Sequence, residues 1–275
     1  MCTWLSVSAS WYFEWLKSPI SATAARRQVL TDAIAVIFTD SDQTYGYRRV
    51  HAQLQRDAVA AGPELVRKIM RELDLVACQP RPWRVSLTES DGREHHIPDR
   101  LEQDFTADAP GVKLIGDITY VPTWEGWMYL ATVIDCCTKT VMGYAMDDNY
   151  QTPLISAALR NATAKHDIQP QAIFHSDRGS NYTSYEFAKT IAELDMCQSM
   201  GRSGICYDNA MAESFFAAYK NERASRTVYP TRTQAMTDAR DYIDNFYNPR
   251  RLHSGLAYKT PQEALNEWTD AQVAV

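Results

Sequence analysis

Three acidic residues in the second half of the chain occupy positions where a carboxylate is costly unless it has a chemical role. Asp117 interrupts an apolar, strand-like run, and Asp177 lies three residues past the apolar run 172–174, at the end of an expected strand. Glu213 lies on an expected helix next to alanine and phenylalanine residues. A charge in an apolar setting is unfavourable unless it is paired or binds a cation. These three residues are therefore the first candidates for a functional site.

If the three carboxylates converge, their repulsion raises their pKa values unless cations enter. Hard divalent ions with oxygen ligands, Mg²⁺ or Mn²⁺, suit such a set. Two ions about 4 Å apart support phosphoryl transfer. The residues alone leave another interpretation open, in which Asp117 caps a strand, Asp177 forms an Asx turn and Glu213 is a solvated helix residue.

The surrounding pattern predicts the elements that would position these residues. A strand ending at Pro122 precedes two longer strands within 126–146, with a turn near Thr138 and Lys139. A helix begins at Thr152, with Pro153 in its first turn. The expected order then continues with a strand at 171–176, a helix at 184–196, a strand at 197–200, a glycine-containing loop at 201–211 and a helix at 212–225. An antiparallel meander followed by αβ crossovers predicts a mixed sheet with helices on its faces. Asp208 and Asn209 are suitable N-cap residues for the last helix.

The first 84 residues favour helices instead. Residues 1–38 have helical spacing with Ser21 as a cap. Two short helices, from about Arg48 to Asp57 and from about Pro63 to Leu73, surround a break. We expect apolar side chains on one face of the second helix and basic ones on another, as in a helix-turn-helix at about 43–76; the apolar set is Leu65, Ile69 and Met70, and the basic set is Arg67, Lys68 and Arg71. An ordinary helical hairpin with a solvated charged face is the alternative.

Charge is distributed unevenly along the chain. The net charge is −6, yet residues 43–84 carry eight Lys or Arg against four Asp or Glu, whereas residues 101–275 carry 15 against 22. Local fields matter more than the total for contact with DNA. The stretch 85–109 is rich in polar residues and is expected to be a linker, with His95 and His96 exposed to solvent. The six cysteines show no disulfide or zinc spacing.

Spacing and local sequence together resemble a known family. Asp177 and Glu213 are separated by 35 residues, as in the D,D(35)E pattern of retroviral integrases and related transposases. The words "GDITYVPTWEGWMYLATVIDCCTKTVMGYAM", "HSDRGSNYTS", "SGICYDNAMAESFFAAYKNE" and "YNPRRLHSGLAYKTP" are similar to the integrase-core transposase of bacterial insertion sequences, often called OrfB. The stretch beginning "YGYRRVHAQL" resembles the helix-turn-helix that precedes this core.

The resemblance implies a fold, a site and a reaction. The fold is α/β: a ribonuclease H-like mixed five-stranded sheet with flanking helices, preceded by an all-α helix-turn-helix region. Asp117, Asp177 and Glu213 match the three catalytic, metal-binding residues, with two Mg²⁺ ions that Mn²⁺ can replace. The reaction is DNA strand cleavage that frees a 3′-OH at the element end, followed by strand transfer by that hydroxyl.

Several basic residues are candidates for contact with DNA. Lys220, seven residues past Glu213, lies on the same helix face and matches a basic position of the family; a solvated charge is the alternative. Arg48 and Arg49 join the basic set of the second short helix. Arg250, Arg251 and His253 could touch phosphates, or their segment could instead pack on the core.

The resemblance implies three kinds of partner. One is double-stranded DNA, both as the terminal inverted repeats of the element and as the target. The others are further copies of the chain in a homo-oligomer on DNA, and a helix-turn-helix protein from an upstream reading frame that fuses or associates with this chain.

The expected domains are a helical region at 1–84, a linker at 85–109 and a catalytic core at 110–268. No apolar run is long enough for a membrane span and the N-terminus lacks a signal-peptide pattern, so we expect a cytoplasmic protein. Two rival functions remain: a non-catalytic DNA-binding regulator, and a ribonuclease H-like nuclease without joining activity.

Overall fold

The computed structural model describes residues 4, 7–17, 20–78, 97–201 and 209–273. These residues form two compact units, which divide between Cys78 and Gln79. The expected histidine pair at 95–96 and the N-cap candidate Asp208 lie outside the described residues. None of the described helices is long and apolar enough to cross a membrane.

The N-terminal unit is entirely helical where it is described, with α1 (Ala9–Lys17), α2 (Ala22–Asp40), α3 (Tyr47–Arg56) and α4 (Pro63–Glu72). The Ser21 hydroxyl accepts a hydrogen bond from the Ala24 amide, as expected for a cap. Helices α2, α3 and α4 contact one another, and Pro63 opens α4. The all-helical N-terminal region that the sequence predicts is therefore confirmed.

One expected core residue of α4 is wrong. Leu65 is exposed, and Val66 is buried with Ile69 and Met70. Positions 66, 69 and 70 follow the i, i+3, i+4 spacing of one helix face, whereas position 65 lies about 100° away from 66. The basic side chains Arg67, Lys68 and Arg71 are exposed, as predicted.

The second unit contains a mixed five-stranded sheet with the order β3-β2-β1-β4-β5. Its strands are β1 (Lys113–Thr123), β2 (Gly126–Asp135), β3 (Val141–Asp147), β4 (Ile173–Ser176) and β5 (Cys197–Met200). β1 pairs antiparallel with β2, and β2 with β3, whereas β4 is parallel to both β1 and β5. The predicted fold class and element order are confirmed.

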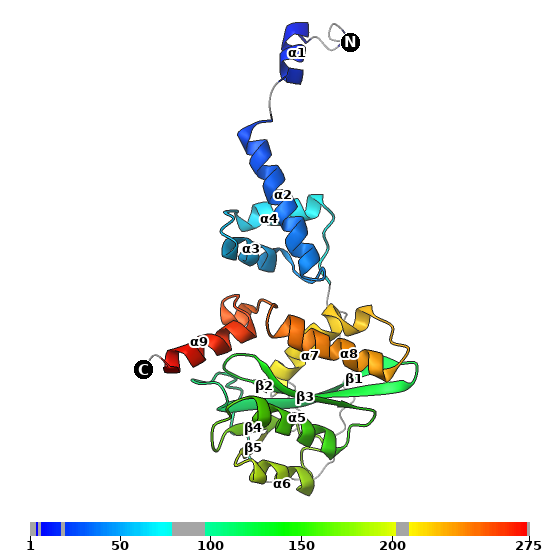
Figure 1. Ribbon diagram of the computed structural model, residues 1–275, viewed down its shortest axis with the longest axis vertical. Coiled ribbons are helices and arrows are strands. Elements are labelled where there is room, and N and C mark those ends of the chain that lie inside the picture. Colours follow the sequence, from blue (N-terminus) through cyan, green and yellow to red (C-terminus); the bar gives the residue numbers. More distant parts are fainter. Residues whose placement is uncertain (1–3, 5–6, 18–19, 79–96, 202–208, 274–275) are drawn as a thin grey trace. The chain divides into compact units, whose positions relative to one another are not determined.

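Helices cover both faces of this sheet (Figure 1). On one face lie α5 (Thr152–Lys165) and α6 (Tyr185–Glu193); on the other lie α7 (Ala210–Glu222) and α8 (Arg232–Asp241). A π-helical turn (Tyr242–Tyr247), two short 3₁₀ turns (Ala224–Arg226 and Ser254–Leu256) and α9 (Pro261–Val273) complete the unit. Helix α7 begins two residues before the expected start, and Asn209 holds its N-cap position without a capping hydrogen bond from its side chain.

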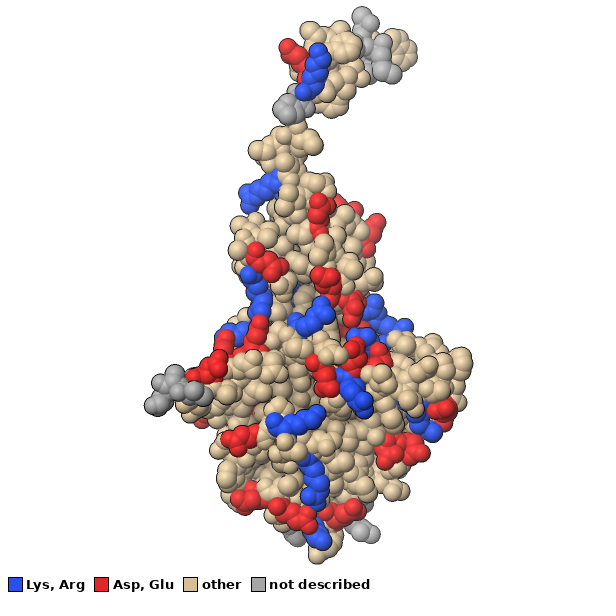
Figure 2. Space-filling model, viewed as in Figure 1, with Lys and Arg blue, Asp and Glu red and all other residues tan. Residues whose placement is uncertain are grey.

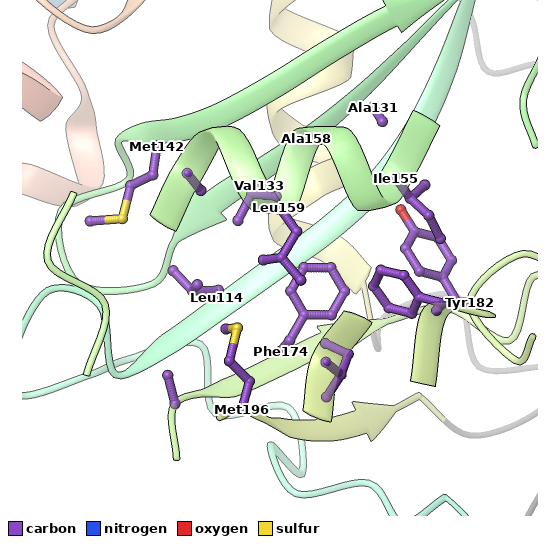
Figure 3. Packing of buried hydrophobic residues seen from close by; sticks show 14 of the residues in the cluster. Leu114, Ala131, Val133, Met142, Ile155, Ala158, Leu159, Phe174, Tyr182 and Met196 are labelled. Atoms are coloured by element: carbon purple, nitrogen blue, oxygen red, sulfur yellow. The ribbon is translucent and has the colours of Figure 1, made fainter. Parts of the chain in front are cut away.

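The main core lies between the sheet and helices α5 and α6. Leu114, Phe174 and Leu159 are fully buried there, and the rings of Phe174, Tyr182 and Phe187 contact one another at centroid distances of 5.3–6.1 Å (Figure 3). Burial of such large side chains is the main favourable contribution to folding. This core fixes the positions of β1 and β4, the two strands that carry the candidate aspartates.

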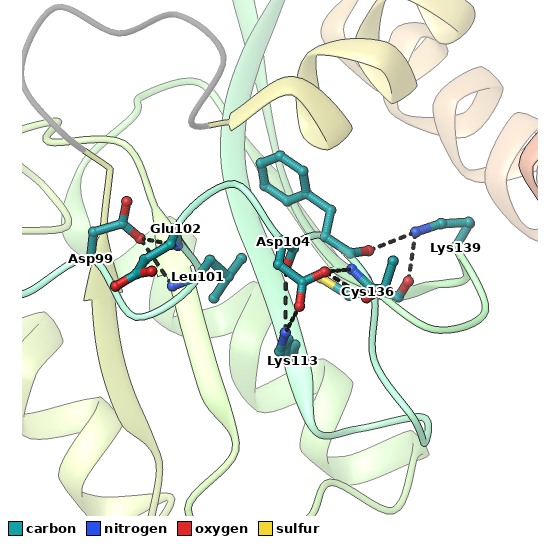
Figure 4. Close-up of polar contacts among 9 residues, drawn as sticks. Asp99, Leu101, Glu102, Asp104, Lys113, Cys136 and Lys139 are labelled. Carbon is teal, nitrogen blue, oxygen red and sulfur yellow. Dashed lines mark hydrogen bonds and ion pairs between the residues drawn. The ribbon is translucent and has the colours of Figure 1, made fainter.

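The segment before β1 is attached to the sheet. Leu101 is buried, and the Asp104 carboxylate pairs with Lys113 Nζ at 2.8 Å (Figure 4). Lys139 Nζ donates to the carbonyl oxygens of Phe105 and Cys136 at 3.0 and 2.6 Å. The part of the expected linker that the structure describes therefore packs on the second unit, while the predicted domain boundaries stay a prediction.

Candidate active site

The register of two parallel strands places Asp117 beside Asp177. Leu114 pairs with Phe174, and Ile115 with His175. Each aspartate lies two residues beyond the last of these pairs, at matching positions. Because side chains alternate along a strand, Asp117 shares the face of Ile115. Asp177 lies one residue past the end of β4, and its charge acts on Asp117, so the two carboxylates lie near each other at this end of the two strands.

The side of the sheet that carries Asp117 is the one that α7 covers. Ile115 packs in a small buried cluster with Leu101, Cys136 and Ala212 of α7, and α7 contacts β1. Glu213 follows Ala212 and is exposed. The opposite side of β1 approaches Phe174 so closely that a Cβ at Gly116 would lie 2.2 Å from its ring. The sequence thus supplies a glycine next to Asp117, where the core leaves no room for a side chain.

The electrostatic environment links the three carboxylates. Loss of hydration raises the pKa of Asp117 well above 3.8, and the negative charges of Asp177 and Glu213 raise that pKa further. Burial likewise raises the pKa of Asp177, while His175 acts against that shift. The pKa of Glu213 is raised by burial. Mutual repulsion of this kind is what the sequence predicts for carboxylates gathered without a cation.

Each aspartate uses one oxygen locally. Asp117 Oδ1 accepts from the Ile118 amide at 2.7 Å, and Asp177 Oδ1 accepts from the Gly179 amide at 3.0 Å. Among the described residues, nothing donates a hydrogen bond to Oδ2 of either side chain. Asp177 therefore does form an Asx turn, the modest role considered from sequence, and still presents its second oxygen.

His175 and Arg178 hold the loop that carries Asp177. His175 is 1% exposed, and its Nδ1 lies 2.8 Å from the Ser199 hydroxyl on β5. Arg178 Nε donates to the Gly201 carbonyl at 2.7 Å. Both contacts tie the end of β4 to β5, so these residues support Asp177 rather than form a hydrolytic triad with it.

Lys220 places a positive charge near the candidate site. Its Nζ lies 4.9 Å from the centroid of the Tyr120 ring, and its charge lowers the pKa of Asp117. Burial lowers the pKa of Lys220 itself, which the charge of Asp117 partly offsets. Lys220 is therefore in contact with the site, and not only a solvated helix charge.

Tyr182 is a neighbour of both aspartates that sequence reasoning missed. Its side chain is buried, and the charges of Asp117 and Asp177 contribute to the raised pKa of its hydroxyl. The available signal was its position five residues after Asp177, in a polar loop where a large aromatic side chain is unexpected.

The basic candidates of the first unit gather around tyrosines. Arg48 of α3 and Arg67 of α4 both lie over the Tyr47 ring, at 5.8 and 5.9 Å, and Arg49 lies 5.7 Å from the Tyr45 ring. Arg67 also pairs with Glu64 at 3.4 Å. The structure thus brings basic residues of both short helices to one place.

Arg250 and Arg251 have different surroundings. Arg250 is exposed, whereas Arg251 is 6% exposed and makes two hydrogen bonds to the Glu222 carboxylate, at 2.6 and 2.5 Å. A guanidinium that is buried and paired is not available to a phosphate. For Arg251 the structure favours the alternative in which this segment packs on the core. The pairing with Glu222 was not expected from sequence, because the two residues lie far apart in the chain.

Charge on the visible face of the second unit is mixed. Basic and acidic side chains are interspersed there rather than gathered into one basic patch (Figure 2).

The described residues contain no group of three or more His, Cys, Asp or Glu side chains close enough to hold a metal ion. The donor chemistry nevertheless suits a hard cation, because the charges of Asp177 and Glu213 act on Asp117 and, within the part of the chain that the structure describes, one oxygen of each aspartate lacks a donor.

The second unit has the fold of an integrase core domain. Residues 107–206 and 194–261 match the family described as Integrase core domain, and residues 25–83 match HTH-like domain. Among solved structures, the chain is similar to a simian T-cell lymphotropic virus intasome (TM-score 0.48, 14% identity, 80% of this chain and 74% of that one). It is also similar to the HTLV-2 integrase catalytic core domain in complex with magnesium (TM-score 0.46, 14% identity, 57% and 98%).

Curated relatives cover nearly the whole chain. The Transposase for insertion sequence element IS904 of Lactococcus lactis is 33% identical over 88% of this chain and 96% of its own. The IS600 31 kDa protein of Shigella sonnei is 34% identical (95% and 96%), and the Transposase InsF for insertion sequence IS3A of Escherichia coli is 32% identical (97% and 93%). The chain belongs to this family of insertion-sequence transposases.

Proposed function

We propose that this protein is a transposase that cleaves DNA at the ends of an insertion sequence and joins the freed ends to other DNA, with Asp117, Asp177 and Glu213 as its catalytic residues. The observation that carries the assignment is that Asp117 on β1 and Asp177, one residue past the end of β4, each lie two residues beyond the last pair of these parallel strands, close enough for the charge of Asp177 to act on Asp117. Glu213 belongs to α7, and its charge acts on Asp117.

A divalent cation, Mg²⁺ or Mn²⁺, fits these residues. Asp117 and Asp177 would hold it through the oxygens that have no donor among the described residues, and Glu213 would complete a second site. When bound, two such ions stabilise the attacking and the leaving oxygen of a phosphoryl transfer. Cation binding would also remove the repulsion that raises the pKa of Asp117.

The chain's own residues position the DNA. In the first step a water oxygen bonds to phosphorus at the element end, the bond to the 3′ oxygen breaks, and a 3′-OH and a 5′-phosphate result. In the second step the 3′-OH attacks another phosphodiester and releases its 3′ oxygen, so the number of phosphodiester bonds is conserved. The two aspartates are held by rigid strands, which favours the precise orientation that such displacements need. Lys220 offers a positive charge beside the reacting phosphate.

The first unit would bind the duplex. Arg48, Arg49, Arg67, Lys68 and Arg71 supply phosphate contacts or base contacts from a helix-turn-helix. Two element ends must meet for joining, so we expect a dimer or larger assembly on DNA. Association with an upstream-frame protein stays a prediction.

The test uses DNA that carries the element ends, with Mg²⁺. Asp177→Asn should abolish both cleavage and joining while DNA binding survives, and Asp148→Asn, a change in an exposed turn, should leave both intact. Retained cleavage by Asp177→Asn would overturn the assignment of the site. Cleavage without joining by the unaltered protein would favour a nuclease, and binding without cleavage a regulator.

A further inference from the structure

Two tryptophans are exposed at the end of the β1–β2 hairpin. Trp124 lies in the two-residue turn that joins Thr123 to Gly126, and 77% of its surface is exposed; Trp127 is the second residue of β2 and is 48% exposed. Large aromatic side chains gain much from burial, and exposed apolar surface of this kind often marks a binding site. These residues therefore need a reason to face solvent.

The hairpin end is held firmly by a segment far along the chain. The Trp124 amide donates to the Tyr229 carbonyl at 3.1 Å. Arg232 Nε donates to the Trp127 carbonyl at 3.0 Å, and the Arg232 amide donates to Glu125 Oε2 at 2.9 Å. Figure 1 shows this hairpin beside α8, which begins at Arg232. The tryptophans are thus presented on a preorganised support, which lowers the entropic cost of binding.

The exposed aromatics connect to the candidate active site through a chain of contacts. The Trp127 ring meets the Tyr120 ring edge to face, at a centroid distance of 4.7 Å. Lys220 Nζ lies 4.9 Å from the centroid of the same Tyr120 ring, and its charge acts on Asp117. Tyr120 follows Asp117 by three residues, roughly 10 Å along a strand. Tyr120, Trp124 and Trp127 form what we call the hairpin aromatic strip.

Lys220 connects the two faces of β1. Asp117 and Tyr120 are three residues apart in the same strand. Because successive side chains of a strand alternate between the faces of the sheet, these two lie on opposite faces. The described pairing of β1 with β4 reaches only to Ile115. Beyond Ile115, the edge of β1 that faces away from β2 is not paired with β4; we call this edge the margin of β1. At this margin Lys220 of α7 contacts Tyr120 while acting on Asp117. A DNA strand with its phosphate at the carboxylates could therefore continue past Lys220 to the hairpin.

We propose that the hairpin aromatic strip stacks with unpaired bases of the DNA strand next to the phosphate that reacts. This inference rests on the proposed function, because it takes the carboxylates as the place of reaction. Stacking on aromatic side chains needs bases whose faces are open, as in melted or single-stranded DNA, and tolerates any sequence. Residues 101–275, which include the hairpin, carry 15 Lys or Arg against 22 Asp or Glu. This part of the chain gains less from phosphate attraction, so stacking near the site would supply binding that charge does not.

The test measures DNA binding without catalysis. Full-length protein is titrated, in EDTA, against a fluorescent oligothymidine strand and against a duplex of the same length. Trp124→Ala should weaken binding to the single strand about tenfold and leave duplex binding unchanged, while Trp124→Phe should restore most of the affinity. Trp268→Ala, at an exposed position on α9, is the matched control and should bind like the unaltered protein.

Two results would overturn the inference. One is equal affinity of Trp124→Ala and the unaltered protein for oligothymidine. The other is loss of self-association by Trp124→Ala in sedimentation at unchanged oligothymidine affinity, which would assign the strip to an interface between copies of this chain. Neither result touches the proposed function, because Mg²⁺-dependent cleavage that needs Asp177 is measured separately.

Discussion

Asp117 on β1 and Asp177, one residue past the end of β4, each lie two residues beyond Ile115 and His175, the last pair of these neighbouring parallel strands. Their separation in the chain is large, but the strand pairing makes them neighbours. Since both strands are fixed by the core around Phe174, the two carboxylates cannot relieve their repulsion by moving apart freely. A concentrated negative charge is therefore part of the fold in the absence of a cation.

The first prediction concerns the stability cost of this charge. The pKa of Asp117 is raised in the folded protein above its ordinary value of 3.8, so the folded state binds more protons than the unfolded state between the two pKa values. Stability is then greatest below the ordinary pKa and falls as pH rises through the folded pKa. In EDTA at neutral pH, Asp117→Asn should melt higher than the unaltered protein, by ~2–4 °C for each kcal/mol of relief.

Circular dichroism melts across a pH series check this prediction. The advantage of Asp117→Asn should vanish near pH 3, where the unaltered carboxyl is also neutral. Asp148→Asn, in an exposed turn, should not differ from the unaltered protein at any pH. Equal melting temperatures of Asp117→Asn and the unaltered protein at neutral pH would contradict the repulsion inferred here.

The second prediction concerns the glycine beside Asp117. An alanine Cβ at Gly116 would lie 2.2 Å from the Phe174 ring, whereas one at Gly62, before α4, would meet nothing within 4 Å. Gly116→Ala should force β1 and β4 to shift and destabilise the protein by about 1–3 kcal/mol. We also expect reduced strand cleavage, because the shift displaces Asp117 relative to Asp177. Gly62→Ala is the control. Urea denaturation measures both, and equal stability of the two variants would contradict the close contact.

Much of the site was predictable because its signals are local. An aspartate inside an apolar strand, another at a strand end and a glutamate on a helix are each visible in a few residues of sequence. The strand order and helix positions follow from periodicity and turn residues for the same reason. Pro122 was expected to end its strand, yet β1 continues to Thr123. A proline has no backbone N–H to donate. It is tolerated at position 122 because β4 does not pair with this part of β1, so no hydrogen bond between these strands is lost.

Other features were not predictable, because they depend on packing between distant segments. Glu222 and Arg251 are far apart in the chain and each resembles an ordinary surface charge in sequence, yet both are buried and paired. Tyr182 reaches the aspartates only because its loop folds back on the core. The choice of Val66 over Leu65 depends on where α4 meets α2 and α3, which the apolar pattern of a short helix does not specify.

The third prediction concerns the buried pair Glu222 and Arg251. The Tyr242 hydroxyl also donates to Glu222, at 2.8 Å, so the carboxylate is fully engaged. Removing one charge leaves the other buried without a partner, and Arg251→Met should cost about 3–5 kcal/mol. The double variant Glu222→Gln with Arg251→Met should recover part of that loss. Urea denaturation measures both.

Arg250→Ala is the control for this pair. Its side chain is exposed, so its stability effect should stay within about 0.5 kcal/mol. If Arg251→Met were as stable as Arg250→Ala but bound DNA more weakly, the packing role of Arg251 would be refuted and a phosphate contact supported.

The fourth prediction concerns Lys68 on α4. Its side chain is exposed, and a phosphate contact releases counterions from DNA. Lys68→Gln should weaken binding to all duplex sequences alike and reduce the slope of log affinity against log salt by about 1. Lys189→Gln, an exposed lysine of α6 in the other unit, should leave the slope unchanged. An unchanged slope for Lys68→Gln would remove this residue from the DNA-binding set.

The last prediction tests whether the charge of Lys220 acts on the candidate site or whether Lys220 is only a solvated residue of α7. The charge of Lys220 lowers the pKa of Asp117, so it keeps the carboxylate ionised, and able to bind a cation, at lower pH. In Lys220→Gln the pKa of Asp117 should rise, and the pH above which Mg²⁺ increases the melting temperature should move upward. Lys189→Gln should retain the original pH midpoint. Because a solvated lysine would leave this midpoint where it is, an unchanged midpoint in Lys220→Gln would refute the coupling between α7 and β1.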